Sequence, residues 1–292
     1  MARVTIHDVA REAGVSPATV DRVLNRRPGV RAATVARVET AVRRLDYQPD
    51  RLAARLARAR DYRFVFVLPS GTNSFMRGLA DEVMEARRRL VAERTEIELV
   101  LVDVFDGDKL VETLEAVGRD GPDGVAVVAL DHPAVREAVN GLAEAGIPVI
   151  TLVSDVPGSR RLHHVGIDNA AAGRTAASLI GRFLGGRGGK IGLVAGSMAL
   201  RDHAERRYGF QQVMERDFPG LSLLPVVEGR DDYVLAGRVT EELIAAHPDL
   251  VGLYNAGAGN RGVIAAVEAA GRGDLVFVAH ELTTFTRRAF VA

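Results

Sequence analysis

The sequence contains no cysteine, and this absence excludes several classes of protein at once. Disulfide-stabilised folds, metal sites built on cysteine and thiol nucleophiles all need that residue. Long hydrophobic runs are missing too: GVAVVAL at 124–130 is typical of the longest, far below the roughly 18 residues of a membrane span. Charges from residue 3 onward leave no apolar core for a signal peptide. We therefore expect a soluble, cytoplasmic protein without membrane contact.

The chain also lacks net charge, because 38 basic residues balance 38 acidic ones. The balance conceals an uneven distribution. Residues 1–62 hold 13 arginines and 7 acidic residues, which leaves +6 in this segment and −6 in the rest of the chain. A basic N-terminal part favours contact with a polyanion such as DNA. The alternative is chance combined with a preference for arginine, since Lys109 and Lys190 are the only lysines.

The N-terminal segment, residues 1–47, predicts three short helices. Thr5 and Asp8 have the spacing of a capping box, and Gly14 is suited to end the first helix. Ser16 and Pro17 are typical of the start of a second helix. Two short helices joined by a turn with glycine, followed by a third, indicate a helix-turn-helix domain. Residues 48–62 have almost no apolar face and are predicted to be a basic linker that folds only on a partner.

From residue 63 the sequence alternates between apolar strands and longer helices, which is typical of parallel sheets covered on both faces. The total of 292 residues is the length of two domains and a small module. The stretch 153–173 interrupts the pattern and predicts a crossing between two α/β lobes, at about 63–165 and 166–292. Ligands of such folds sit at the carboxyl ends of the strands. Strands are expected at 63–68, 97–103, 124–129, 148–153, 190–195, 222–227, 250–255 and 275–279.

Motifs of enzymes are weak in this chain. Gly257–Gly262 matches the G-x-G-x-x-G pattern of dinucleotide sites, with Glu281 about 20 residues later, but little chain remains to build such a domain. The glycine-rich stretch at 185–190 precedes a strand instead of following one, and we interpret it as a turn. The seven histidines show no metal-binding spacing. We expect no metal, no cofactor and no catalytic residue; a sugar-binding or nucleotide-dependent enzyme that uses this loop is the alternative.

The helix-turn-helix region TIHDVAREAGVSPATVDRVLN at 5–25, with LDYQP at 45–49 and LAARLA at 52–57, resembles the DNA-binding headpiece and hinge of the lactose-repressor (LacI/GalR) family. The chain from residue 63 onward is similar to that family's effector domain, which resembles periplasmic sugar-binding proteins. The resemblance implies an α/β fold: an all-α headpiece followed by a two-lobed core of parallel sheets flanked by helices.

The resemblance also implies roles for residues of the headpiece. Its second helix would lie in the major groove, where Arg22 can bind guanine and Ala18 can pack on a thymine methyl group. Short hydrogen-bonding side chains would contact phosphates, although helix capping is the alternative for Thr5 and Ser16. The hinge leucine, Leu56, would enter the minor groove beside Arg55. The complete predicted DNA-contacting set is Thr5, Ser16, Pro17, Ala18, Thr19, Arg22, Asn25, Arg55 and Leu56.

For the core, the resemblance implies a site for a sugar, polyol or sugar acid between the lobes. Polar groups would hold the hydroxyls and an aromatic ring would pack on the C–H face. Core packing is the alternative for Phe75, and a helix-start role is the alternative for His132. The predicted effector-binding residues are Asn73, Phe75, His132, Asp155, Arg206, Asn255 and Glu281.

Two positions depart from the family pattern. Asp21 stands where the family has serine, and its carboxylate would repel phosphates unless Arg22 or Arg26 pairs with it. The sequence stops at Ala292, where the family core normally continues; such an end would leave a strand edge unpaired. No leucine heptads follow, so we expect a homodimer. The function that we expect is a DNA-binding transcriptional regulator, most simply a repressor, whose operator affinity a small effector controls.

Overall fold

The computed structural model describes residues 4–24, 27–47 and 61–291, and the chain divides into two compact units at residue 60. The first unit contains α1 (Ile6–Ala13), α2 (Pro17–Leu24) and α3 (Ala32–Arg44). One valine of each helix, Val9, Val20 and Val38, is fully buried at the centre of this unit. Gly14 ends α1 with a left-handed φ of 62°, a conformation that glycine adopts without strain. The turn therefore redirects the chain directly into α2.

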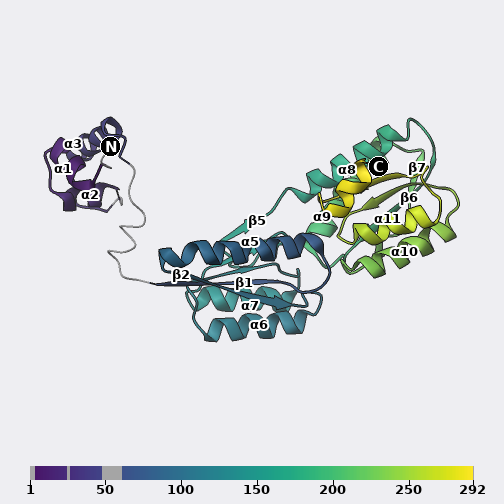
Figure 1. Cartoon of the computed structure of the whole chain (residues 1–292), viewed down its shortest axis with the longest axis horizontal. Coiled ribbons are helices and arrows are strands. Elements are labelled where there is room, and N and C mark those ends of the chain that lie inside the picture. The colour runs from purple at the N-terminus through teal and green to yellow at the C-terminus, as the bar shows by residue number, and fades with distance from the viewer. Residues whose placement is uncertain (1–3, 25–26, 48–60, 292) are drawn as a thin grey trace. The chain divides into compact units, whose positions relative to one another are not determined.

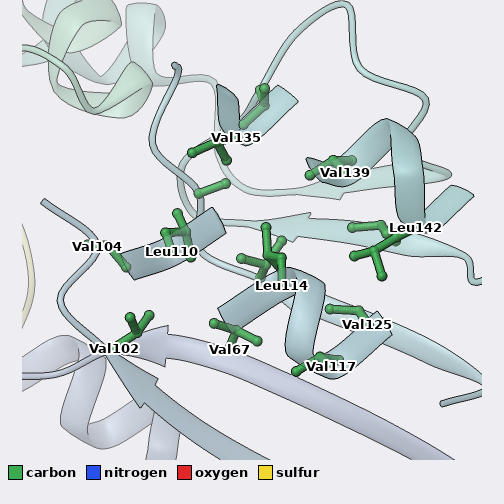
Figure 2. Close-up of a cluster of buried hydrophobic side chains, with 14 of the residues drawn as sticks. Val67, Val102, Val104, Leu110, Leu114, Val117, Val125, Val135, Val139 and Leu142 are labelled. Carbon is green, nitrogen blue, oxygen red and sulfur yellow. The ribbon is translucent and has the colours of Figure 1, made fainter. Parts of the chain in front are cut away.

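The second unit begins with a five-stranded parallel sheet in the order β2-β1-β3-β4-β5. Helix α5 packs on one face of this sheet, while α6 and α7 cover the other (Figure 1). Figure 2 shows the valine and leucine side chains that α6, α7 and the strands bury between them. The elements are β1 (Tyr62–Pro69), α5 (Ser74–Leu90), the 3₁₀ turn η1 (Val91–Glu93), β2 (Thr95–Val102), α6 (Gly107–Arg119), β3 (Gly124–Val127), α7 (Pro133–Glu144), β4 (Val149–Leu152) and β5 (His163–Val165).

A second parallel sheet follows, in the order β10-β9-β6-β7, with the short β8 also paired to β6. Alternate residues of β6 face opposite sides: Leu193 packs with α8 and α9, whereas Val194 packs with α10 and α11. The elements are α8 (Asn169–Phe183), β6 (Gly189–Ala195), α9 (Arg201–Asp217), β7 (Leu221–Leu223), β8 (Val227–Glu228), α10 (Tyr233–Ala246), β9 (Leu250–Asn255), α11 (Asn260–Ala269), β10 (Val276–Ala279) and α12 (Thr284–Val291).

The predicted α/β class, with an all-α helix-turn-helix region before a core of two parallel sheets, is confirmed. Two details differ. The stretch 153–173 contains a strand, β5, that the sequence pattern did not indicate. The strand expected at 222–227 is interrupted between β7 and β8, where Pro225 has no N–H to donate to a ladder. In the described part of the chain, no helix is long and apolar enough to cross a membrane.

Candidate functional site

The second helix of the N-terminal unit presents a defined outer face. Val20 faces the core of the unit and is fully buried, whereas Ala18 and Arg22, four residues apart, lie on the outer side. Residues at this spacing share one face of a helix. Pro17 occupies the first position of α2. The outer face of α2 therefore carries a guanidinium and a methyl group.

Thr5 and Ser16 both cap helices. The Thr5 hydroxyl and N–H both donate to Asp8 Oδ2, at 2.7 and 2.9 Å, and Asp8 N–H donates back to Thr5 Oγ1 at 3.4 Å. Ser16 Oγ accepts from the N–H of Thr19 at 3.2 Å, and the two hydroxyl oxygens lie 2.9 Å apart. The capping role is thus present at both positions, and contact with phosphate stays a prediction for both.

The unusual Asp21 of α2 forms an ion pair. Its carboxylate lies 3.3 Å from Nη1 of Arg27, a partner that the sequence pattern did not indicate. Three of the predicted DNA-contacting residues, Asn25, Arg55 and Leu56, lie outside the described residues.

The second unit contains a cavity of about 200 Å³ at the carboxyl ends of its strands. Residues that directly follow β1, β2, β3 and β4 line one side, and residues that follow β6 and β8 line the other. Parallel sheets place ligand sites at this end, where strands stop and loops begin. The lining consists of Pro69, Ser70, Gly71, Thr72, Asn73, Met76, Asp103, Val104, Phe105, Val128, Val153, Ser154, Leu200, Asp202, Arg230, Asp231, Asp232 and Leu235.

Polar contacts join the loops of the two sheets around this cavity. The Thr72 hydroxyl donates to Asp232 Oδ2 at 2.8 Å, and Asn73 Nδ2 donates to Asp231 Oδ2 at 3.2 Å. Asn73 is itself held in place, because its Oδ1 caps α5 by accepting two N–H groups of the first turn. Specific hydrogen bonds therefore connect the loops of the two sheets beside the cavity.

Of the seven predicted effector-binding residues, the structure places Asn73 in this cavity and Glu281 in a second one. The second cavity, about 190 Å³, shares Thr72 with the first and also has Phe285 in its lining. Burial, with the nearby carboxylate of Asp231 as the second cause, raises the pKa of Glu281 to about 7. Phe75 is 41% exposed and lines neither cavity.

Two of the remaining predicted effector-binding residues, His132 and Asp155, make hydrogen bonds within the protein. His132 caps α7, where its Nδ1 accepts the N–H of Ala134 at 3.3 Å. Asp155 accepts two hydrogen bonds from Arg161; burial alone would raise the pKa of Asp155, but these bonds and one from Thr151 lower it to about 2.

Arg206 and Asn255 are buried among the carboxyl-end loops of the second sheet. Arg206 donates to Asn169 Oδ1 at 3.0 Å and to the carbonyl of Ala256 at 2.7 Å. Asn255 is fully buried and donates to Ala258 O and Asn260 Oδ1. Neither side chain lines the first or the second cavity, so direct contact with an effector stays a prediction for both.

The glycine-rich loop Gly257–Gly262 is explained by packing. A Cβ on Gly257 would lie 2.5 Å from the nitrogen of Gly196, and one on Gly262 would lie 1.8 Å from the carbonyl oxygen of Tyr233. Each glycine thus permits a close backbone approach that any side chain would prevent. Among the described residues, no three His, Asp or Glu side chains converge as a metal ion would require.

Sequence reasoning missed all of the charged lining of the first cavity: Asp103, Asp202, Arg230, Asp231 and Asp232. A usable signal was present, because Asp103 ends the predicted strand 97–103 and the run 230–232 closely follows the predicted strand 222–227. The position of Asp202, in the first turn of α9, required the structure.

Comparison with known protein families gives two matches along the chain. The family described as "Periplasmic binding protein domain" matches residues 64–292, and the family described as "Bacterial regulatory proteins, lacI family" matches residues 5–50.

Individual relatives agree with both matches. Catabolite control protein A of Priestia megaterium is 28% identical over 81% of this chain and 66% of its own length. The HTH-type transcriptional regulator AglR of Rhizobium meliloti is 30% identical over 72% of this chain and 58% of its own. The chain thus spans less than two thirds of the length of either regulator. Among solved structures, the sugar-binding protein of a sugar ABC transporter from Bacillus halodurans is 26% identical to this chain. The match covers 77% of this chain and 76% of that protein, with a TM-score of 0.63.

Proposed function

Because the chain belongs to the lacI family of bacterial regulatory proteins, with a periplasmic binding protein domain as its core, we propose that it is a transcriptional regulator that binds operator DNA. Its headpiece reads the operator, and a small polyhydroxylated effector in the core controls operator affinity. A homodimer places two headpieces on the half-sites of a near-palindromic operator. Such a regulator, most simply a repressor, works in the cytoplasm and needs no catalytic residue.

The observation that carries the proposal is the outer face of α2. Val20 anchors the helix in the headpiece core, so Ala18 and Arg22 point away from that core. A guanidinium can donate two hydrogen bonds to the edge of guanine, and a methyl group packs on thymine. The charge balance of +6 in residues 1–62 supplies the electrostatic attraction to phosphates.

The test is to select duplexes from a random pool with the full chain and then to compare single substitutions on the selected sequence. Arg22→Ala should weaken specific binding about 10-fold or more and relax the base preference at one position, because a bidentate base contact is worth about 1–3 kcal/mol. Arg37→Ala is the matched control, since it removes the same charge from the exposed side of α3. It should weaken specific and random duplexes equally.

Salt dependence provides the second measurement. The logarithm of the binding constant should fall linearly with the logarithm of salt concentration, as counterion release requires. Two results would contradict the proposal: no selected sequence preferred over random duplex, or an Arg22→Ala protein that behaves like Arg37→Ala. The second result would assign base reading to another surface.

A further inference from the structure

The cavity at the carboxyl ends of the strands is strongly acidic. Its lining carries four aspartates, Asp103, Asp202, Asp231 and Asp232, and one basic side chain, Arg230. A neutral sugar needs donors and acceptors but has no charge that would match such an excess. The lining therefore indicates the charge of the effector as well as its hydroxyl groups, an inference that rests on the proposed function.

Two of the four carboxylates are satisfied by neutral donors. Asp231 accepts hydrogen bonds from the N–H of Ala258 at 2.9 Å and from Asn73. Asp232 accepts from the hydroxyl of Thr72 and from two backbone N–H groups at the start of α10. These donors satisfy oxygen lone pairs but leave the negative charges in place.

Among the residues that the structure describes, the guanidinium of the cavity forms an ion pair with one carboxylate. Arg230 Nη2 lies 3.8 Å from Asp103 Oδ2, and the same guanidinium stacks on the ring of Phe105 at 5.1 Å. In the part of the chain that the structure describes, Nε2 of His203 lies 3.6 Å from Asp202 Oδ2 and 3.9 Å from Asp231 Oδ1, and it forms ion pairs with them only when its ring is protonated. The cavity thus retains an excess of negative charge.

Asp202 is the least satisfied of the four. Its side chain is buried, with the residue 4% exposed, and its Oδ1 has no hydrogen-bond partner among the described residues. The first turn of α9 favours a carboxylate through the helix dipole, but this does not provide a hydrogen bond to Oδ1. A buried carboxylate oxygen without a hydrogen bond is costly and rare, and one explanation is a ligand that completes it.

We propose that the effector carries a positively charged amino group on a polyhydroxylated skeleton, as in an amino sugar or amino polyol, and that Asp202 binds this group. An ammonium group offers three donors and one positive charge, which match a carboxylate that lines an acidic cavity and has one oxygen without a hydrogen bond. The lone pairs of the Thr72 hydroxyl and the second N–H of Asn73 Nδ2 then remain for the hydroxyl groups. Neutral sugars leave the charge of Asp202 unmatched, and sugar acids add repulsion.

The raised pKa of Glu281 is consistent with this assignment. Among its causes after burial are the carboxylates of Asp231 and Asp202, so the negative field of the cavity extends into the neighbouring cavity. A bound cation reduces that field.

Matched ligands test the proposal. Calorimetric titration of the full chain near pH 6.5 compares D-glucosamine, D-glucose and D-glucuronate, and the corresponding galacto and manno compounds. In at least one series the amine should bind at least 10-fold more tightly than the neutral sugar, with the acid weakest. Asp202→Asn should reduce that preference at least 10-fold. Asp81→Asn, which removes an exposed carboxylate of α5 outside the cavity, should leave it unchanged.

The outcomes separate this inference from the proposed function. Equal or tighter binding of the neutral sugar in every series, no binding of any amine, or an unchanged preference in a folded Asp202→Asn protein would overturn the inference. If that variant does not fold, the comparison of amine with neutral sugar on the unaltered chain still decides. Duplex binding is measured on the same preparation. If a neutral sugar alters operator affinity, the proposed function stands and only the positive charge of the effector is refuted.

Discussion

Two adjacent residues, His280 and Glu281, respond to burial in opposite directions. Burial lowers the pKa of His280 from 6.5 to about 4, and its Nε2 lies 2.7 Å from the hydroxyl of Tyr254. Burial raises the pKa of Glu281 from 4.5 to about 7. The neutral histidine contributes stability that is lost as pH falls from 6.5 towards 4, whereas the protonated glutamate contributes stability that is lost as pH rises from 4.5 to 7. The two trends oppose each other where they overlap.

At the residue scale, Glu281→Gln should separate these trends. Glutamine stays neutral, so the variant should gain stability over the unaltered chain as pH rises from 4.5 to 7, by on the order of 3 kcal/mol, and the gain should then level off. Urea unfolding followed by circular dichroism at pH 5, 6, 7 and 8 measures the difference. Glu268→Gln, at an exposed position of α11, is the control without such a trend. If the stability difference between Glu281→Gln and the unaltered chain did not change with pH, the raised pKa of Glu281 would be contradicted.

At the scale of elements, α8 and α9 approach each other through two glycines. A Cβ on Gly173 would lie 2.0 Å from the carbonyl oxygen of Arg206, and one on Gly209 would lie 2.0 Å from that of Ala170. The backbones are thus in contact, and the same crossing lets Arg206 reach Asn169. Arg206, which the family resemblance assigns to the effector, is held by this helix pair at the carboxyl ends of the strands.

Substitution of Gly173 by alanine should therefore destabilise the core by about 1–3 kcal/mol or more, because the added methyl group has no space. The matched control is Gly141→Ala: this helical glycine has nothing within 4 Å of a Cβ, so alanine should be neutral or stabilise α7 by up to about 1 kcal/mol. Chemical denaturation measures both. Similar effects of the two substitutions would refute the close packing of α8 on α9.

Most elements could be predicted from sequence because their apolar residues recur at the period of a strand or a helix. The exceptions have local causes. β5 is three residues long and begins with His163 and His164, so it has no apolar run to detect. The strand predicted at 222–227 is interrupted between β7 and β8 at Pro225, because proline has no N–H to donate to a strand ladder.

At the scale of the whole molecule, the chain consists of two compact units, Met1–Arg60 and Asp61–Ala292, each with its own hydrophobic core. Independent cores unfold as separate cooperative units when little surface joins them. Unfolding enthalpy scales with the number of residues, so the larger unit should absorb about four times the heat of the smaller.

Scanning calorimetry of the full chain should accordingly resolve two transitions. A duplex that binds the headpiece should raise the midpoint of the smaller transition, and a ligand of the core should raise that of the larger one, because each ligand binds one folded unit and not its unfolded form. Random duplex at high salt is the control for the first shift. A single transition that both ligands shift together would contradict the independence of the units.

The sequence by itself determined the secondary-structure order, the parallel α/β class and the basic N-terminal segment. These properties follow from local periodicity and from residue type, which neighbouring positions carry. Only the tertiary structure decided which charged groups share a cavity. Asp103 follows a strand of the first sheet, while Asp202, Asp231 and Asp232 follow strands of the second, and they meet because the carboxyl ends of both sheets line the same cavity. Folding alone brings those carboxylates together, and burial leaves Oδ1 of Asp202 without a hydrogen bond from any residue that the structure describes.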